Sequence, residues 1–121
     1  MKRYLLFALF FFSITILIAQ NYNTQLNSLN VEHYKLSIDV NDQNDSIKAE
    51  MAVNLKFKKS IDSFYLDLFN RDSISGKGMV VDSVYQNKIP IEFTHSNNKL
   101  QITPKHNFPN LPYTYLIKYK G

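Results

Sequence analysis

The chain has three histidines, His33, His95 and His106, whose imidazoles are suited to zinc ligation and to acid–base chemistry near neutral pH. No two of them form a His-x-His pair or lie four residues apart. A catalytic zinc needs three protein ligands and an open fourth position. The spacing therefore predicts no local zinc site, and we expect the histidines to face solvent or to pack against tyrosine.

Oxygen-bearing side chains between residues 39 and 50 follow the spacing of a calcium-binding loop. Positions 1, 3, 5, 7 and 12 of that template are occupied by Asp39, Asn41, Gln43, Asp45 and Glu50. However, position 6 is Asn44 instead of the glycine that makes the sharp turn, and strand-like segments flank the loop where helices should be. The pattern favours a solvated hairpin turn over a calcium site.

The remaining candidates for catalysis do not form a constellation. Glu32, Glu50, Glu92 and scattered aspartates give no carboxylate pair for general acid and base catalysis. The sequence also lacks a G-x-S-x-G nucleophile motif and a glycine-rich phosphate loop. From sequence we therefore assign no catalytic, cofactor-binding or metal-binding residue.

Aromatic residues gather near the end of the chain, where Tyr113, Tyr115 and Tyr119 alternate and Phe108 lies close by. Such a stripe is able to form a platform for a sugar ring or a peptide. A stripe on one face of a strand more often packs in a core, and we favour packing.

The elements that must position these side chains are strands, because apolar residues recur at every second position and nowhere with helical spacing. Residues 33–57 predict a β-hairpin with Lys48, Glu50, Asn54 and Lys56 facing outward. We expect a mobile polar loop at 70–78 and an irregular, proline-rich crossing at 104–112. The other strands are expected near 64–68, 79–85, 89–95, 100–102 and 113–119. The sequence thus predicts an all-β fold, an antiparallel β-sandwich or curved sheet of about seven strands.

A positive start at Lys2 and Arg3 precedes an apolar run from residue 4 to 19. Because the run is shorter than the roughly 20 residues of a membrane-spanning helix, we expect a cleaved signal peptide over 1–20. The alternative is an uncleaved N-terminal anchor. We expect a flexible entry segment at 21–30, a β domain at 31–121 beginning near Val31, and an exported protein, periplasmic or extracellular, with no stable membrane span after cleavage.

Length, charge and cysteine content restrict the possible partners. The 121 residues fit one small domain, and without Lys2 and Arg3 the net charge falls from +4 to about +2. So small a surplus does not form the basic stripe that nucleic acid requires, so we exclude nucleic acid as a partner. The absence of cysteine means that core burial or a larger polypeptide must supply stability.

The order of the segments resembles the opening of the aminopeptidase N-like zinc metallopeptidases. The matching stretches are V-E-H-Y-K-L-S-I-D-V at 31–40, I-K-A-E-M-A-V-N-L-K-F at 47–57, F-Y-L-D-L at 64–68, M-V-V-D-S-V-Y-Q-N-K at 79–88 and Y-L-I-K-Y-K-G at 115–121. In that family such strands build an N-terminal β domain. Ala49 and the Gln86-Asn87-Lys88 turn depart from a glycine and an Asn-Gly turn that are common in the family.

The resemblance implies an exported enzyme that removes N-terminal residues from peptides, with zinc held by H-E-x-x-H and a downstream glutamate, and a Gly-x-Met-Glu-Asn segment gripping the peptide amine. None of these motifs occurs in residues 1–121, so no functional residue carries over. We expect a fragment, incomplete at its C-terminal end and inactive alone. Its expected partner is the following catalytic domain, which would hold the zinc and contact the peptide substrate. The alternative is a free-standing exported β-sandwich that binds a glycan or a protein through the Tyr-rich strand at 113–119.

Overall fold

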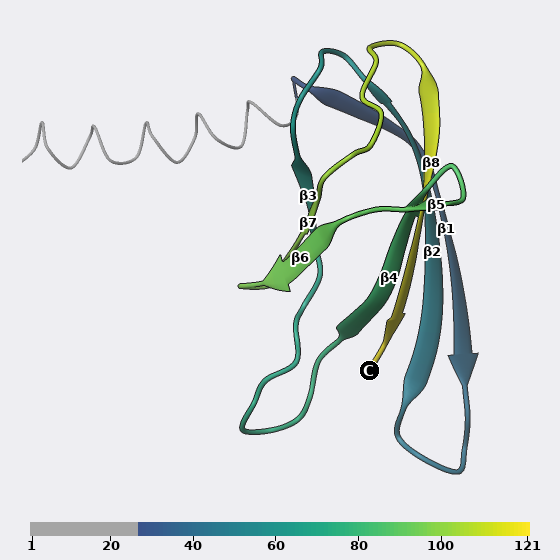
Figure 1. Ribbon diagram of the computed structural model, residues 1–121. Coiled ribbons are helices and arrows are strands. Elements are labelled where there is room, and N and C mark those ends of the chain that lie inside the picture. Colours follow the sequence, from purple (N-terminus) through teal and green to yellow (C-terminus); the bar gives the residue numbers. More distant parts are fainter. Residues whose placement is uncertain (1–26) are drawn as a thin grey trace, which may run out of the picture.

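The computed structural model describes residues 27–121, which form eight β-strands in two antiparallel sheets and no helix (Figure 1). The larger sheet has the order β1-β2-β8-β4-β5 and the smaller sheet the order β3-β7-β6. The strands are β1 (Leu29–Val40), β2 (Ile47–Phe57), β3 (Phe64–Asp67), β4 (Val80–Gln86), β5 (Ile89–Pro90), β6 (Phe93–Ser96), β7 (Lys99–Ile102) and β8 (Pro112–Lys120). The all-β prediction is confirmed. The expected signal peptide at 1–20 lies outside the described residues.

The long hairpin of β1 and β2 is present as predicted, and it pairs without interruption from Val40↔Ile47 up to a bulge between Val31 and His33. Its turn is closed by side-chain amides: Gln43 N–H donates to Asn41 Oδ1 at 2.6 Å, and Ser46 N–H donates to Asn44 Oδ1 at 3.0 Å. These bonds support the prediction of a solvated turn between the strands.

The hairpin begins earlier than expected, which corrects the described part of the flexible segment at 21–30. Leu29 already pairs with Phe57, and Lys58 N–H donates to the Ser28 carbonyl at 2.8 Å. Ser28 is buried as a result. Ser28 and Asn30 are polar, yet residues 28–30 are ordered because β2 extends far enough to pair with them and Leu29 packs against the core.

The prediction of one strand at 89–95 is wrong in one respect, because the structure has two strands there, β5 and β6, which belong to different sheets. Asn87 and Lys88 have φ values of 46° and 70°, as in the tight turns that join hairpin strands, and return the chain from β4 to β5. Ile91 N–H still bonds the Val84 carbonyl at 3.0 Å, after which the chain crosses to the smaller sheet as β6.

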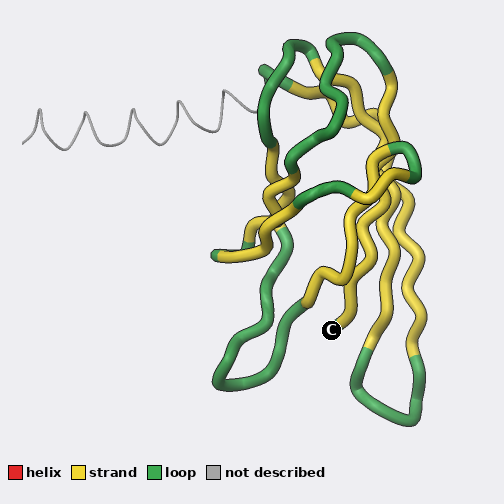
Figure 2. Tube along the Cα trace, in the orientation of Figure 1, coloured by secondary structure: helices red, strands yellow, loops and turns green. Residues whose placement is uncertain are grey.

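The core lies between the inner faces of the two sheets, which approach one another only at one end of the molecule (Figures 1 and 2). Two aromatic contacts tie the sheets together, Phe57 with Phe64 at 5.9 Å and Phe64 with Tyr115 at 5.1 Å between ring centroids. A third contact, Phe57 with Tyr113 at 5.6 Å, joins β2 to β8 within the larger sheet. Tyr113, Tyr115 and Tyr119 are all buried. The Tyr stripe therefore packs in the core, as favoured from the sequence, and presents no platform for a ligand.

The expected loop at 70–78 forms a turn around Asp72. The Asp72 carboxylate accepts hydrogen bonds from the backbone N–H groups of Ile74 at 2.6 Å and Ser75 at 3.1 Å. Both bonds favour the charged form and lower the pKa of this exposed carboxyl group. Gly78 has φ +116° where the loop passes close to the backbone of Asn70, so this position requires glycine.

Candidate functional site

The three histidines do not come together in the structure. His33 lies exposed on β1, His95 lies on β6, and His106 lies exposed in the crossing before β8. Among residues 27–121, no three His, Asp or Glu side chains are close enough to hold a metal ion. The residues described here therefore do not fit a zinc ion, and the hairpin turn does not assemble the calcium-loop oxygens.

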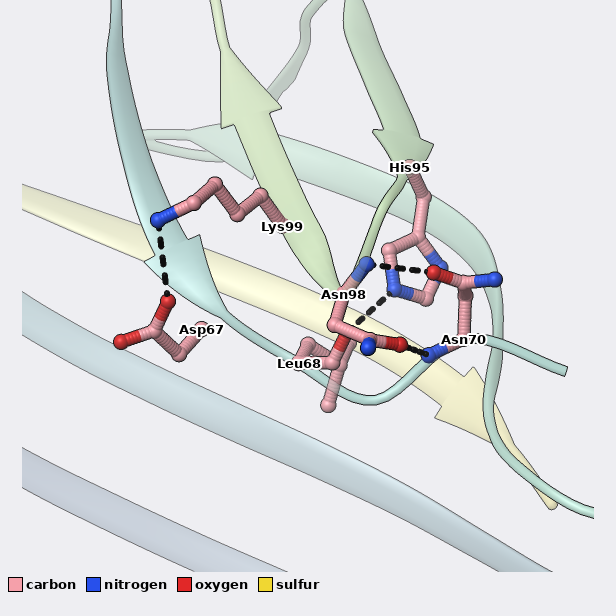
Figure 3. Close-up of polar contacts among 6 residues, drawn as sticks. All are labelled: Asp67, Leu68, Asn70, His95, Asn98 and Lys99. Carbon is pink, nitrogen blue, oxygen red and sulfur yellow. Dashed lines mark hydrogen bonds and ion pairs between the residues drawn. The ribbon is translucent and has the colours of Figure 1, made fainter.

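His95 instead belongs to a set of polar contacts at one end of the smaller sheet (Figure 3). Its Nε2 atom lies 2.8 Å from the Leu68 carbonyl. Asn70 and Asn98 bond reciprocally: Asn70 N–H donates to Asn98 Oδ1 at 3.1 Å, and Asn98 N–H donates to Asn70 Oδ1 at 2.5 Å. Each of these contacts joins the chain after β3 to the β6–β7 hairpin, so the cluster fixes a loop.

Gln86 at the end of β4 is a buried polar residue, which sequence reasoning placed only in a turn. Its side-chain amide donates to Tyr115 Oη at 2.7 Å and to the His106 carbonyl, while its Oε1 accepts from Lys105 N–H and His106 N–H, both at 2.9 Å. All four hydrogen bonds of a glutamine are thus satisfied. Gln86 anchors the irregular crossing to the core.

Burial raises the pKa of the Tyr115 hydroxyl well above its ordinary value, and the neighbouring Tyr113 adds to the rise. The hydrogen bond from Gln86 opposes it only in part. A hydroxyl with a raised pKa stays protonated and is poorly suited to act as a nucleophile or base. The Gln86–Tyr115 pair is therefore a structural element of the core.

The outer face of the larger sheet carries many charged side chains, and some of them form ion pairs with one another. Ion pairs join Lys56 to Glu32 at 3.0 Å, Lys118 to Glu50 at 3.4 Å, and Lys120 to Asp82 at 3.2 Å. The predicted outward orientation of Lys48, Glu50, Asn54 and Lys56 is confirmed, since each is exposed or only partly buried. Exposed pairs of this kind contribute little to stability.

The inner face of β1 is different, because it carries an uncovered apolar row of Tyr34, Leu36, Ile38 and Val40. These side chains are 53%, 53%, 52% and 72% exposed. They share a face with the buried residues of β2, with Tyr34 opposite Val53 and Ile38 opposite Ala49. The strands of the smaller sheet are only four residues long, and Figure 1 shows β1 and β2 running on past them to the hairpin turn.

The apolar row is the surface feature of residues 27–121 that most resembles a binding surface. Large apolar side chains gathered on one exposed patch are typical of surfaces that contact another protein segment. No helix in residues 27–121 is long and apolar enough to span a membrane. Residues 27–121 thus form a buried core and an exposed apolar row, and they bring together no group of His, Asp and Glu side chains able to hold a metal ion.

Comparison with known proteins gives one informative result. No protein-family model matches the chain, and no curated protein matches it. Among solved structures, the chain is similar to the M1 zinc metallopeptidase of Deinococcus radiodurans, with a TM-score of 0.63 and 18% identity. A mutant of that enzyme bound to a Tyr-Ser-Ala substrate and a two-domain M1 zinc metallopeptidase mutant bound to L-arginine match equally well.

In each of these matches the alignment covers 78% of this chain and 20% of the other chain. The chain therefore spans about a fifth of the length of these metallopeptidases. At this identity the likeness shows the fold, which resembles that of the N-terminal domain of M1 zinc metallopeptidases.

Proposed function

We propose that the chain is the non-catalytic N-terminal β domain of an exported zinc-dependent aminopeptidase, which removes N-terminal residues from peptides. The observation that carries the proposal is the shared fold with M1 zinc metallopeptidases over 78% of this chain. The order of the sequence segments, from V-E-H-Y-K-L at 31–36 to Y-L-I-K-Y-K-G at 115–121, supports it independently.

The chemistry of the described residues is consistent with a supporting role. Residues 27–121 do not bring together ligands that fit zinc. In the proposed protein the zinc would be held by the following catalytic domain, which is also where the peptide would react. This β domain would cap that domain and shape its active-site side.

The apolar row is the part of the domain that such a partner would cover. Its side chains continue the inner face of the sheet beyond the smaller sheet, so a further layer packed there would extend the existing core. Burying apolar surface stabilises by about 25 cal/mol per Å². A part of the same polypeptide packed on this face would gain that energy without the translational entropy loss of a separate partner.

The coding sequence tests the proposal directly. We expect an open reading frame that continues past Gly121 and encodes H-E-x-x-H within the next few hundred codons. A stop codon directly after the codon for Gly121, or a long open reading frame without that motif, would refute the proposal.

A second test examines the docking surface in that longer polypeptide. Leu36→Lys should lower its thermal midpoint strongly, because it would bury a charge at the covered face. Ser37→Lys on the opposite face of the same strand is the matched control and should have little effect, since Ser37 is exposed. In the 121-residue chain both substitutions should be nearly neutral because Leu36 is 53% exposed there. Equal midpoints for Leu36→Lys and Ser37→Lys in the longer polypeptide would show that the row stays uncovered.

The alternative function, binding of a glycan or protein through the Tyr-rich strand, loses the surface on which it was based. Tyr115 is fully buried, and Tyr113 and Tyr119 are 6% and 9% exposed. Alanine at Tyr113 or Tyr115 is accordingly expected to abolish folding, which circular dichroism would report.

A further inference from the structure

The outer edge of β1 is the longest strand edge without a neighbouring strand within residues 27–121; the next longest belongs to β4, of which β5 covers only Tyr85 and Gln86. β1 has twelve residues and stands at the end of the larger sheet. The opposite end of that sheet is β5, which has only two residues, one of them Pro90. The edge strands of the smaller sheet, β3 and β6, have four residues each. A long regular edge presents unpaired N–H and C=O groups and is a template for pairing with another strand.

The sequence of β1 is complementary to itself about Ser37. If two copies pair antiparallel with Ser37 on the two-fold axis, Lys35 of one copy lies opposite Asp39 of the other, and the reverse. On the inner face, Tyr34 then lies opposite Val40 and Leu36 opposite Ile38 in the second copy. Opposite charges and aromatic–β-branched pairs are the cross-strand pairs that stabilise sheets.

Other registers lose this complementarity. Centring the pair on Leu36 or Ile38 separates Lys35 from Asp39, whereas centring it on Lys35 or Asp39 places like charges directly opposite each other. An axis between two residues would put the apolar row opposite the polar row. Lys35 and Asp39 are also free to pair, because neither takes part in the ion pairs found in residues 27–121.

We propose that two copies of this chain pair antiparallel along their β1 edges, with Ser37 on the two-fold axis, and so join their larger sheets into one continuous sheet. The inference is independent of the proposed function. It uses the backbone edge of β1 and lateral side-chain contacts, and it leaves the inner face open to a covering layer. The contact is small, so the dimer should be weak and reversible, with a dissociation constant of about 1 to 100 μM.

Sedimentation equilibrium of the purified protein, in the form that the cell produces, tests the charge pairing. Lys35→Asp and Asp39→Lys should each weaken the dimer about tenfold or more, because two symmetry-related pairs turn from attractive to repulsive. The double variant carrying both exchanges restores the complementarity and should regain most of the wild-type affinity. Lys77→Asp and Asp62→Lys make the same charge changes at exposed loop positions away from β1 and should leave the affinity unchanged.

Cross-linking tests the register. The chain has no cysteine, so Ser37→Cys introduces a single thiol, which should give a disulfide-linked dimer under mild oxidation. Lys35→Cys is the matched control on the same strand and face. Its two thiols would lie four residues apart along the paired strands, beyond disulfide reach, and should give little cross-linked product.

Two results would overturn the proposal. One is a monomer at all concentrations up to about 1 mM, which is about tenfold to a thousandfold above the expected dissociation constants. The other is a dimer whose affinity is unchanged by Lys35→Asp and Asp39→Lys, which would place the interface elsewhere. Thermal midpoints of all variants should match the wild type, so that loss of the dimer is separated from loss of the fold. The reading frame past Gly121 has no bearing on these outcomes, so the proposed function fails or stands separately.

Discussion

Replacing Gln86 with leucine removes the polar anchor of the crossing at 104–112 while roughly preserving the volume of the side chain. The change deletes four hydrogen bonds, two of them to Lys105 and His106 N–H groups at 2.9 Å. At about 0.5 to 1.5 kcal/mol each, their sum is about 2 to 6 kcal/mol. The Lys105 and His106 backbone groups lie in an exposed segment and can turn to water, whereas the Tyr115 hydroxyl cannot.

We therefore expect Gln86→Leu to lower the free energy of unfolding by about 2 to 4 kcal/mol. In a domain of this size that loss corresponds to a fall of roughly 10 to 25 °C in the thermal midpoint. Urea denaturation followed by circular dichroism measures the first quantity and a thermal scan the second. Hydrogen exchange at the Lys105 and His106 amides gives a local readout and should accelerate.

The matched control is Gln101→Leu, because Gln101 is exposed on β7 and makes one side-chain hydrogen bond, to Ser63 Oγ at 3.1 Å. It should change stability by no more than about 0.5 kcal/mol. If Gln86→Leu costs no more than Gln101→Leu, and the two amides exchange at unchanged rates, the reasoning about the buried network is refuted.

Two further predictions follow from single positions. Burial raises the pKa of the Tyr115 hydroxyl above its ordinary 10.0, so the folded state binds this proton more tightly than the unfolded state. The contribution of this hydroxyl to the free energy of unfolding is therefore complete below pH 10 and is lost as the pH rises above 10. Wild-type stability should fall more steeply above pH 10 than that of Tyr115→Phe; parallel pH profiles by urea titration would contradict this. Gly78→Ala would place a Cβ 2.4 Å from the Asn70 carbonyl oxygen, whereas Gly76→Ala meets nothing within 4 Å. Thermal scans should therefore show a loss of about 1 kcal/mol for Gly76→Ala, the cost of a left-handed backbone, and a clearly larger loss for Gly78→Ala; equal losses would refute the close approach.

Sequence periodicity predicted most strands because each has one apolar face. The hairpin at 33–57 and the strand at 113–119 alternate over long stretches, and their structure follows that alternation. Periodicity does not say which sheet a strand joins. Residues 89–95 alternate as one strand, yet β5 and β6 belong to different sheets because the chain crosses between layers after Pro90.

The sequence predicts one property of the apolar row, its shared face, but not its exposure to solvent. The alternation of Tyr34, Leu36, Ile38 and Val40 places them on one face, but their exposure depends on the length of a sheet that is built from strands far away in sequence. Gln86 shows the same limit, because its four partners come from residues 19 to 29 positions further along the chain. The sequence offers one signal for it, a polar residue two positions after the buried Val84.

The most direct test of the central proposal is to isolate the native polypeptide that carries residues 27–121 from its host, using an antibody raised against this domain. Its mass, its zinc content and its hydrolysis of aminoacyl anilides should be measured on the same preparation. We expect a chain several times longer than 121 residues that contains one catalytic zinc and releases N-terminal residues. A product of about 100 residues without zinc or activity, consistent with one small free-standing domain, would contradict the account.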